Sequence, residues 1–132
     1  MSKKFTLGKH ERLKSRKSIE SLFNKGQSLQ ATPLRFVYRI VEEKELQLAV
    51  GASAKNFKRA VDRNRIKRLI RESYRLEKLS LKEKLFAAQK GMHVFISFTG
   101  REIPDHTTIR AAVIKGLRKL EKTINENSTS HT

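Results

Sequence analysis

Residues 58–75 read KRAVDRNRIKRLIRESYR, and this stretch determines how the rest of the sequence is interpreted. At about 100° per residue, its apolar side chains fall on one half of a helical wheel, joined there by Leu76 and, near the margin, by Arg65. Packed neighbours at that margin are expected to fix the Arg65 guanidinium. The pattern predicts a helix over 58–78 with an apolar face of Val61, Ile66, Leu69, Ile70 and Leu76, and a polar face of Arg63, Asn64, Lys67, Arg68, Arg71 and Arg75.

Like charges recur every fourth residue along the polar face, at Arg63, Lys67, Arg71 and Arg75. Side chains at this spacing are neighbours, so like charges repel and destabilise the helix. A nucleic-acid backbone would neutralise them, and the counterions that it releases would add affinity. The alternative is a solvated charged face without a ligand. The repulsion favours a helix that binds RNA or DNA.

The composition also indicates a polyanionic partner. The chain has 132 residues, with 30 Lys and Arg against 13 Asp and Glu, which gives a formal net charge of +17. This length suits one domain, expected to span 1–124 and to be followed by a disordered polar tail over 125–132. There is no cysteine, no apolar run of membrane-spanning length and no hydrophobic signal region. We therefore expect a cytoplasmic protein without a membrane contact.

The remaining pattern predicts an α+β fold. Ser15 is expected to cap a first helix that Gly26 ends, and residues 27–33 are expected to form a loop. Alternating apolar residues predict strands at 34–41 and 46–51, joined as a hairpin by a turn over 42–45.

Beyond that hairpin, Asn56 is a candidate cap for the basic helix, and residues 94–98 form a third apolar strand. Pro104 and Asp105 are expected to begin a final helix. Its core stripe would be Ile109, Ala112, Val113, Leu117 and Leu120. One sheet packed with helices follows from this order.

Residues 63–72, RNRIKRLIRE, resemble the signature of a known family, the protein subunit of bacterial ribonuclease P. The resemblance covers roughly residues 10–122 and is strongest at 58–76. It implies a single small domain of order α-β-β-(short β)-α-β-α with one mixed sheet, the short strand lying near 53–55. It also implies a left-handed crossover from that strand to residues 94–98, although parallel strands are usually joined with right-handed connections.

The resemblance also implies a function, the endonucleolytic removal of 5′ leaders from precursor tRNAs. A large RNA with bound Mg²⁺ would perform the hydrolysis, so no catalytic residue and no metal ligand are expected in the protein. The expected partners are this catalytic RNA and the precursor tRNA leader, with no obligatory protein partner. The basic helix would contact the catalytic RNA through Arg59, Arg63, Asn64, Arg65, Lys67, Arg68 and Arg71.

Aromatic side chains provide a second signal. Phe23 on the first helix and Phe36 and Tyr38 on the first strand are expected to line a groove where that helix crosses the sheet. Bases stack on such side chains while basic residues follow the backbone. The resemblance assigns this groove to the leader, with Ile19 where the family often carries an aromatic residue, and Lys55 is expected where the groove opens. The alternative is that Phe23 and Phe36 belong to the core.

No pattern of catalytic residues accompanies these signals. The four histidines lack metal-ligand spacing, and there is neither a glycine-rich phosphate loop nor an acidic cluster suited to Mg²⁺. The residues alone therefore predict a basic RNA-binding α+β domain. A ribosomal or ribosome-assembly protein is the alternative, because it shares the charge and size but needs no aromatic groove. A protein-only nuclease would need a carboxylate or histidine cluster.

Overall fold

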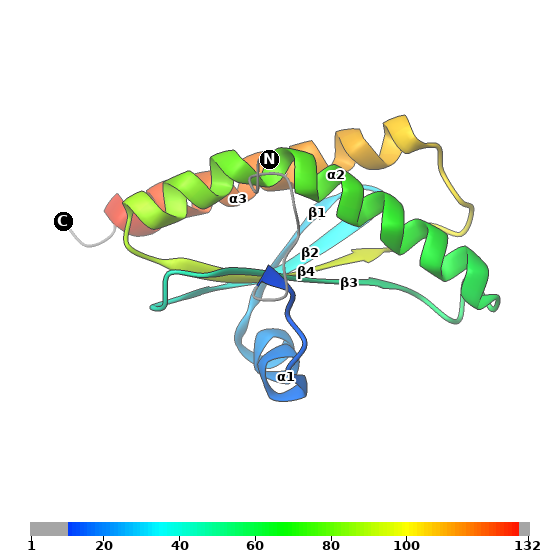
Figure 1. Cartoon of the computed structure of the whole chain (residues 1–132), viewed down its shortest axis with the longest axis horizontal. Coiled ribbons are helices and arrows are strands. Elements are labelled where there is room, and N and C mark those ends of the chain that lie inside the picture. Colours follow the sequence, from blue (N-terminus) through cyan, green and yellow to red (C-terminus); the bar gives the residue numbers. More distant parts are fainter. Residues whose placement is uncertain (1–10, 130–132) are drawn as a thin grey trace, which may run out of the picture.

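The computed structural model of the chain describes residues 11–129, with side chains described as far as residue 124. Within this part of the chain, three helices and four strands follow one another as α1–β1–β2–β3–α2–β4–α3. Their bounds are α1 Arg16–Lys25, β1 Gln27–Ala31, β2 Leu34–Val41, β3 Leu46–Ala52, α2 Ala60–Ala87, β4 Gly91–Phe98 and α3 His106–Thr129. Helices α2 and α3 lie together on one face of the sheet, and α1 lies on the other face (Figure 1).

The strands form one mixed sheet in the order β1-β2-β4-β3. Strand β4 lies between its two partners and pairs antiparallel with β2 and parallel with β3. The predicted hairpin of β2 and β3 is therefore wrong, because β4 separates these two strands. The hairpin is instead formed by β1 and β2, since residues 27–31, expected as a loop, pair with residues 34–38.

The β3–α2–β4 connection is left-handed, as the family resemblance implies. In Figure 1, β3 lies in front of β4, and α2 returns above the sheet in the direction opposite to both strands. The separate short strand expected near 53–55 is not found in the described chain, because β3 ends at Ala52 and residues 54–56 form a turn.

The main core lies between the sheet and the pair of helices α2 and α3. The predicted stripe of α3 is confirmed, because all five of its residues are buried. The stripe of α2 differs from the prediction: Ile66 and Ile70 are buried, but Val61 is 66% exposed and Leu76 is 36% exposed. The buried stripe instead continues through Ser73, Tyr74, Lys78, Leu81 and Leu85. Two of these positions are polar, so hydrophobicity alone does not identify them.

The helix ends agree with the sequence patterns in part. The Ser15 side chain accepts a hydrogen bond from the Ser18 N–H, and Gly26 ends α1, as predicted. Helix α2 begins after Arg59 rather than at a cap formed by Asn56, and it extends nine residues past 78, to Ala87. Helix α3 continues past residue 124, where the sequence analysis ends the domain, as far as Thr129.

The N-terminal segment, residues 11–14, is anchored to both α2 and β3. The Leu13 N–H donates to the Leu48 carbonyl at 2.8 Å, which places the segment along the edge of β3. Glu11 forms an ion pair with Lys78 of α2, and the exposed fractions of the two side chains are only 9% and 2%. Burial and the Glu11 carboxylate also raise the pKa of Tyr74. The segment therefore forms a fixed wall beside the sheet.

Replacing Glu11 with alanine should lower the free energy of unfolding by about 3–5 kcal/mol, because Lys78 would remain buried without its counter-charge. Urea denaturation followed by circular dichroism measures this loss. The Glu43→Ala variant removes an exposed carboxylate and should change stability by less than about 0.5 kcal/mol. Adding Lys78→Met to Glu11→Ala should restore most of the stability. A double variant as unstable as Glu11→Ala would contradict the ion pair as the cause.

Candidate nucleic-acid interface

Helix α1 covers only part of its face of the sheet. Its contact with the sheet is a small apolar cluster in which Leu22 of α1 packs with Leu13 and Val37. Arg39 of β2 holds the same helix from another side, because its Nη1 donates to the Ser21 Oγ at 2.7 Å. Since α1 has 10 residues and buries only Leu22 completely, the sheet stays open toward β3.

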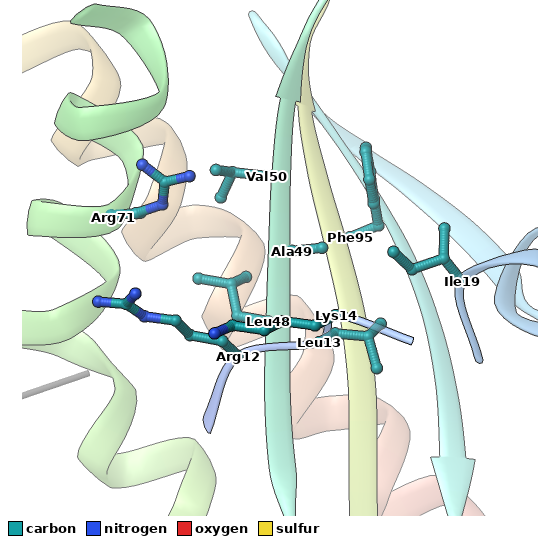
Figure 2. Close-up of a pocket in the computed structure, with 9 residues that line it drawn as sticks. All are labelled: Arg12, Leu13, Lys14, Ile19, Leu48, Ala49, Val50, Arg71 and Phe95. Atoms are coloured by element: carbon teal, nitrogen blue, oxygen red, sulfur yellow. The ribbon is translucent and has the colours of Figure 1, made fainter. Parts of the chain in front are cut away.

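A cleft of about 420 Å³ lies between α1, β3, α2 and the N-terminal segment, and we name it the α1 cleft. Figure 2 shows its lining residues, which are Arg12, Leu13, Lys14, Ile19, Leu48, Ala49, Val50, Arg71 and Phe95. Phe95 also lines a second hollow of about 420 Å³ near the end of β3. Gly51 leaves space for this ring, because a Cβ there would lie 2.9 Å from Phe95. The open face therefore runs past Phe95 along β3.

An aromatic pair, one ring exposed and the other half-buried, lies beside the α1 cleft. Phe23 of α1 is 51% exposed, and its ring centroid lies 5.0 Å from that of Phe95, with the planes tilted by 58°. Ile19, one turn earlier on α1, is half-buried and packs against the same apolar cluster as Phe95. A partly exposed ring held by a second ring offers a surface on which a base can stack.

Phe95 was not predicted to line the groove, and two other aromatic residues do not lie where the sequence predicted. Phe36 is fully buried in the main core, where a Cβ on Gly116 of α3 would clash with its ring. Tyr38 is 7% exposed, belongs to the same core, and donates its hydroxyl to Gln27 Oε1 at 3.0 Å. The expected groove positions of Phe36 and Tyr38 are therefore wrong, because both side chains point away from α1.

The alternation of side chains along the strands explains why Phe95, and not Phe36 or Tyr38, faces α1. Val37, Phe95 and Ala49 are paired neighbours across β2, β4 and β3, and they share the face toward α1. The signal for Phe95 was present in the sequence, since Val94 and Ile96 must both point to the opposite face from it. Which face belongs to α1 depends on the long-range packing of the sheet.

Lys55 lies in the turn after β3 and is exposed. Its N–H donates to the Ser53 Oγ at 3.1 Å, which fixes the turn. Ser53 and Asn56 line the second hollow, whereas Lys55 itself does not line either hollow. Lys55 therefore stands at the end of the open face.

The N-terminal half of α2 presents most of its polar residues to solvent. Asn64, Arg65 and Arg68 are exposed and, with Val61, line a shallow hollow of about 400 Å³. The prediction that packed neighbours fix the Arg65 guanidinium is therefore wrong, because this side chain is exposed. Arg63 instead donates from Nη1 to the carbonyls of Phe57 and Lys58, at 2.7 and 2.9 Å, and so fixes the chain that enters the helix.

The other expected residues of α2 differ in orientation. Arg59 is the exposed N-cap residue and makes no side-chain cap hydrogen bond, and Lys67 is half-buried. Arg71 is exposed but lines the α1 cleft, away from the hollow beside Arg65. The seven residues therefore differ in exposure and do not all line the same hollow.

Ion pairs distribute the charge unevenly along α2. Between its C-terminal half and α3, Glu77 lies 3.0 Å from Arg110, and Lys84 lies 2.9 Å from Glu121, which also lies 2.6 Å from Arg118 of its own helix. Burial alone would raise the pKa of Glu121, but hydrogen bonds from Lys84 and Arg118 outweigh it and lower this pKa. None of the seven basic or amide residues expected to contact RNA forms an ion pair within the described chain. The N-terminal half of α2 therefore carries uncompensated positive charge.

Neither a cluster of metal ligands nor a membrane-spanning helix is found among the described residues. Among residues 11–124, no group of three or more His, Asp or Glu side chains comes together in a way that could hold a metal ion. Within the same described range, no helix combines the length and apolar character needed to cross a bilayer.

The fold and this charge distribution define a class of small, basic α+β domains with one uncompensated cationic helix and an aromatic cleft. A family model described as Ribonuclease P matches residues 7–121, and the chain belongs to this family. The predicted kinship with the protein subunit of bacterial ribonuclease P is thereby confirmed. Membership makes the chain a protein component of an RNA-processing ribonucleoprotein and implies an RNA partner.

Individual relatives agree with this assignment. The chain is 38% identical over 119 residues to the ribonuclease P protein component of Porphyromonas gingivalis, covering 88% of this chain and 87% of the relative. It is 37% identical over 126 residues to that of Chlorobaculum tepidum, covering 86% and 82%. The solved structure of the Staphylococcus aureus RNase P protein superposes with a TM-score of 0.63 at 23% identity, covering 86% and 97%. This last similarity supports the fold.

Proposed function

We propose that the protein binds the catalytic RNA of ribonuclease P through the N-terminal half of α2, and the single-stranded 5′ leader of precursor tRNA along the α1 cleft. In this way it assists the endonucleolytic removal of the leader. The observation that carries the leader assignment is the pair of the exposed Phe23 and the half-buried Phe95 beside a cleft with basic residues at its rim. We place this activity in the cytoplasm and propose no obligatory protein partner.

The contact with the catalytic RNA is supported by the charges of α2. Asn64, Arg65 and Arg68 are exposed and have no carboxylate partner among the described residues. The guanidinium groups of Arg65 and Arg68 would replace cations condensed on the RNA phosphates, and the release of these cations favours association. Arg63 contributes indirectly, because its hydrogen bonds to two backbone carbonyls fix the first turn of the helix.

The contact with the leader is supported by the shape and chemistry of the α1 cleft. An extended single strand alternates flat bases with charged phosphates, so it needs aromatic surface beside cationic side chains. Phe23 and Phe95 supply the aromatic surface, Ile19 adds an apolar contact, and Arg12 and Lys14 lie on the rim. Lys55 stands at the other end of the open face, where the strand would leave the protein.

Hydrolysis is assigned to the RNA partner, and the Mg²⁺ ions are proposed to be bound mainly by that RNA. The described side chains do not fit a Mg²⁺ site of their own, because no three potential ligands converge among them. The protein would act by holding substrate, which raises the affinity of the particle for precursor tRNA. A ribosomal role would share the charge and size but gives no reason for the Phe23–Phe95 pair.

Arg65→Ala should weaken binding to the catalytic RNA and reduce the slope of log K against log[salt] by about 0.7–0.9, the value for one lost phosphate contact. Filter binding at several salt concentrations measures the slope. Lys122→Ala removes an exposed lysine from α3 and should leave the slope unchanged. Identical slopes for wild type and Arg65→Ala would remove this part of α2 from the RNA-binding surface.

Phe23→Ala should weaken precursor tRNA binding by the assembled particle by about 1–3 kcal/mol, because one base loses its stacking surface. Mature tRNA lacks the leader and should bind wild type and variant equally, as measured by equilibrium binding of both tRNAs. Phe86→Ala, which removes a half-buried ring from the far end of α2, should affect neither tRNA. Equal weakening of both tRNAs by Phe23→Ala would show that the cleft does not hold the leader.

A further inference from the structure

Three cationic side chains come together at the α1 cleft from two separate parts of the chain. Arg12 and Lys14 belong to the N-terminal segment, and Arg71 belongs to α2, yet all three line the same cleft. Figure 2 shows the Arg12 and Arg71 side chains reaching into the space between α2 and β3. Arg12 is held there by the backbone bridge between its own residue and Leu48.

No carboxylate compensates this cluster within the described chain. None of the three side chains forms an ion pair there, and Glu11, the nearest acidic residue in sequence to Arg12, is buried against Lys78. Residues 1–10 contain neither Asp nor Glu, so the preceding segment has no carboxylate side chain to offer. Burial and the nearby Arg12 guanidinium lower the pKa of Arg71, as expected when one cation faces another.

Such an arrangement costs stability unless an anion lies between the charges. Like charges at close range repel, and here the backbone contacts of residues 12–13 with β3 and the position of Arg71 on α2 fix the backbones that carry these charges side by side. A phosphodiester is an anion that matches guanidinium groups, because each can donate two hydrogen bonds to its oxygens. The same cleft contains Ile19 and Phe95, which favours a phosphate that is followed by a base.

We propose that Arg12, Lys14 and Arg71 clamp one backbone phosphodiester of the precursor tRNA leader, while a neighbouring base lies against Phe23 and Phe95. The clamp rests on the proposed leader function and specifies where in the cleft the backbone is held. Arg71 would thus contact the leader, whereas the sequence predicts that it contacts the catalytic RNA. The N-terminal segment thereby becomes part of the substrate site.

A set of precursor tRNAs, each with one neutral methylphosphonate linkage in the leader, tests the clamp. Their binding is measured with particles assembled from wild type, Arg12→Gln and Arg71→Gln. Wild type should bind about tenfold more weakly when one particular linkage is neutral, because a charge-assisted contact is lost. In both variants the neutral linkage at that position should change affinity by less than about twofold. Lys115→Gln, an exposed residue of α3, should reproduce the wild-type profile.

Three outcomes would overturn the clamp. The first is a wild-type profile without a sensitive linkage, and the second is a full effect of the neutral linkage in Arg12→Gln. The third is equal weakening of precursor and mature tRNA by both variants, which would place the cluster on another part of the RNA. If Phe23→Ala still weakens the binding of precursor tRNA alone, only the clamp fails. If Phe23→Ala weakens both tRNAs equally or neither, the leader assignment fails as well. Neither arginine variant should lower the melting temperature, since each removes a repulsion.

Discussion

Helix α2 has to bury one narrow stripe against the sheet while the rest of its surface carries an excess of positive charge. Ile66, Ile70, Leu81 and Leu85 are fully buried along that stripe and hold the helix in place. Ion pairs with α3 compensate the C-terminal half, but the described residues offer no such pairs to the half that begins at Ala60. The core therefore supports a surface whose repulsion a bound polyanion would relieve, in a chain with a net charge of +17.

The α1 cleft exists because helices cover the two faces of the sheet unequally. Two long helices close one face, whereas the ten residues of α1 leave the other face open toward β3 (Figure 1). The buried pair of Glu11 and Lys78 fixes the N-terminal segment as a wall of this open region. Phe95 fills its floor because Gly51 has no side chain to exclude the ring. The cleft is thus a consequence of helix length and of one glycine.

Local patterns predicted the helices, the apolar strands and the Ser15 and Gly26 ends of α1, because these depend on neighbours in sequence. They did not predict β1, whose five residues include only two apolar ones, Leu29 and Ala31, nor the insertion of β4 between β2 and β3. The positions of Phe36 and Tyr38 were wrong for the same reason, since pairing and facing are set by residues far away in the chain. The burial of Lys78 could not be predicted from local patterns either, because its partner Glu11 is 67 positions away in the sequence.

The central claim is that the leader and the catalytic RNA occupy different surfaces of the protein. Photocrosslinking tests it most directly, with 4-thiouridine placed either in the leader or in the catalytic RNA and the crosslinked peptides identified by mass spectrometry. The account predicts that the leader crosslinks to α1 and β4, near Phe23 and Phe95, and that the catalytic RNA crosslinks to α2 near Arg65 and Arg68. Leader crosslinks on the exposed face of α2 near Arg65, with none on α1 or β4, would contradict it.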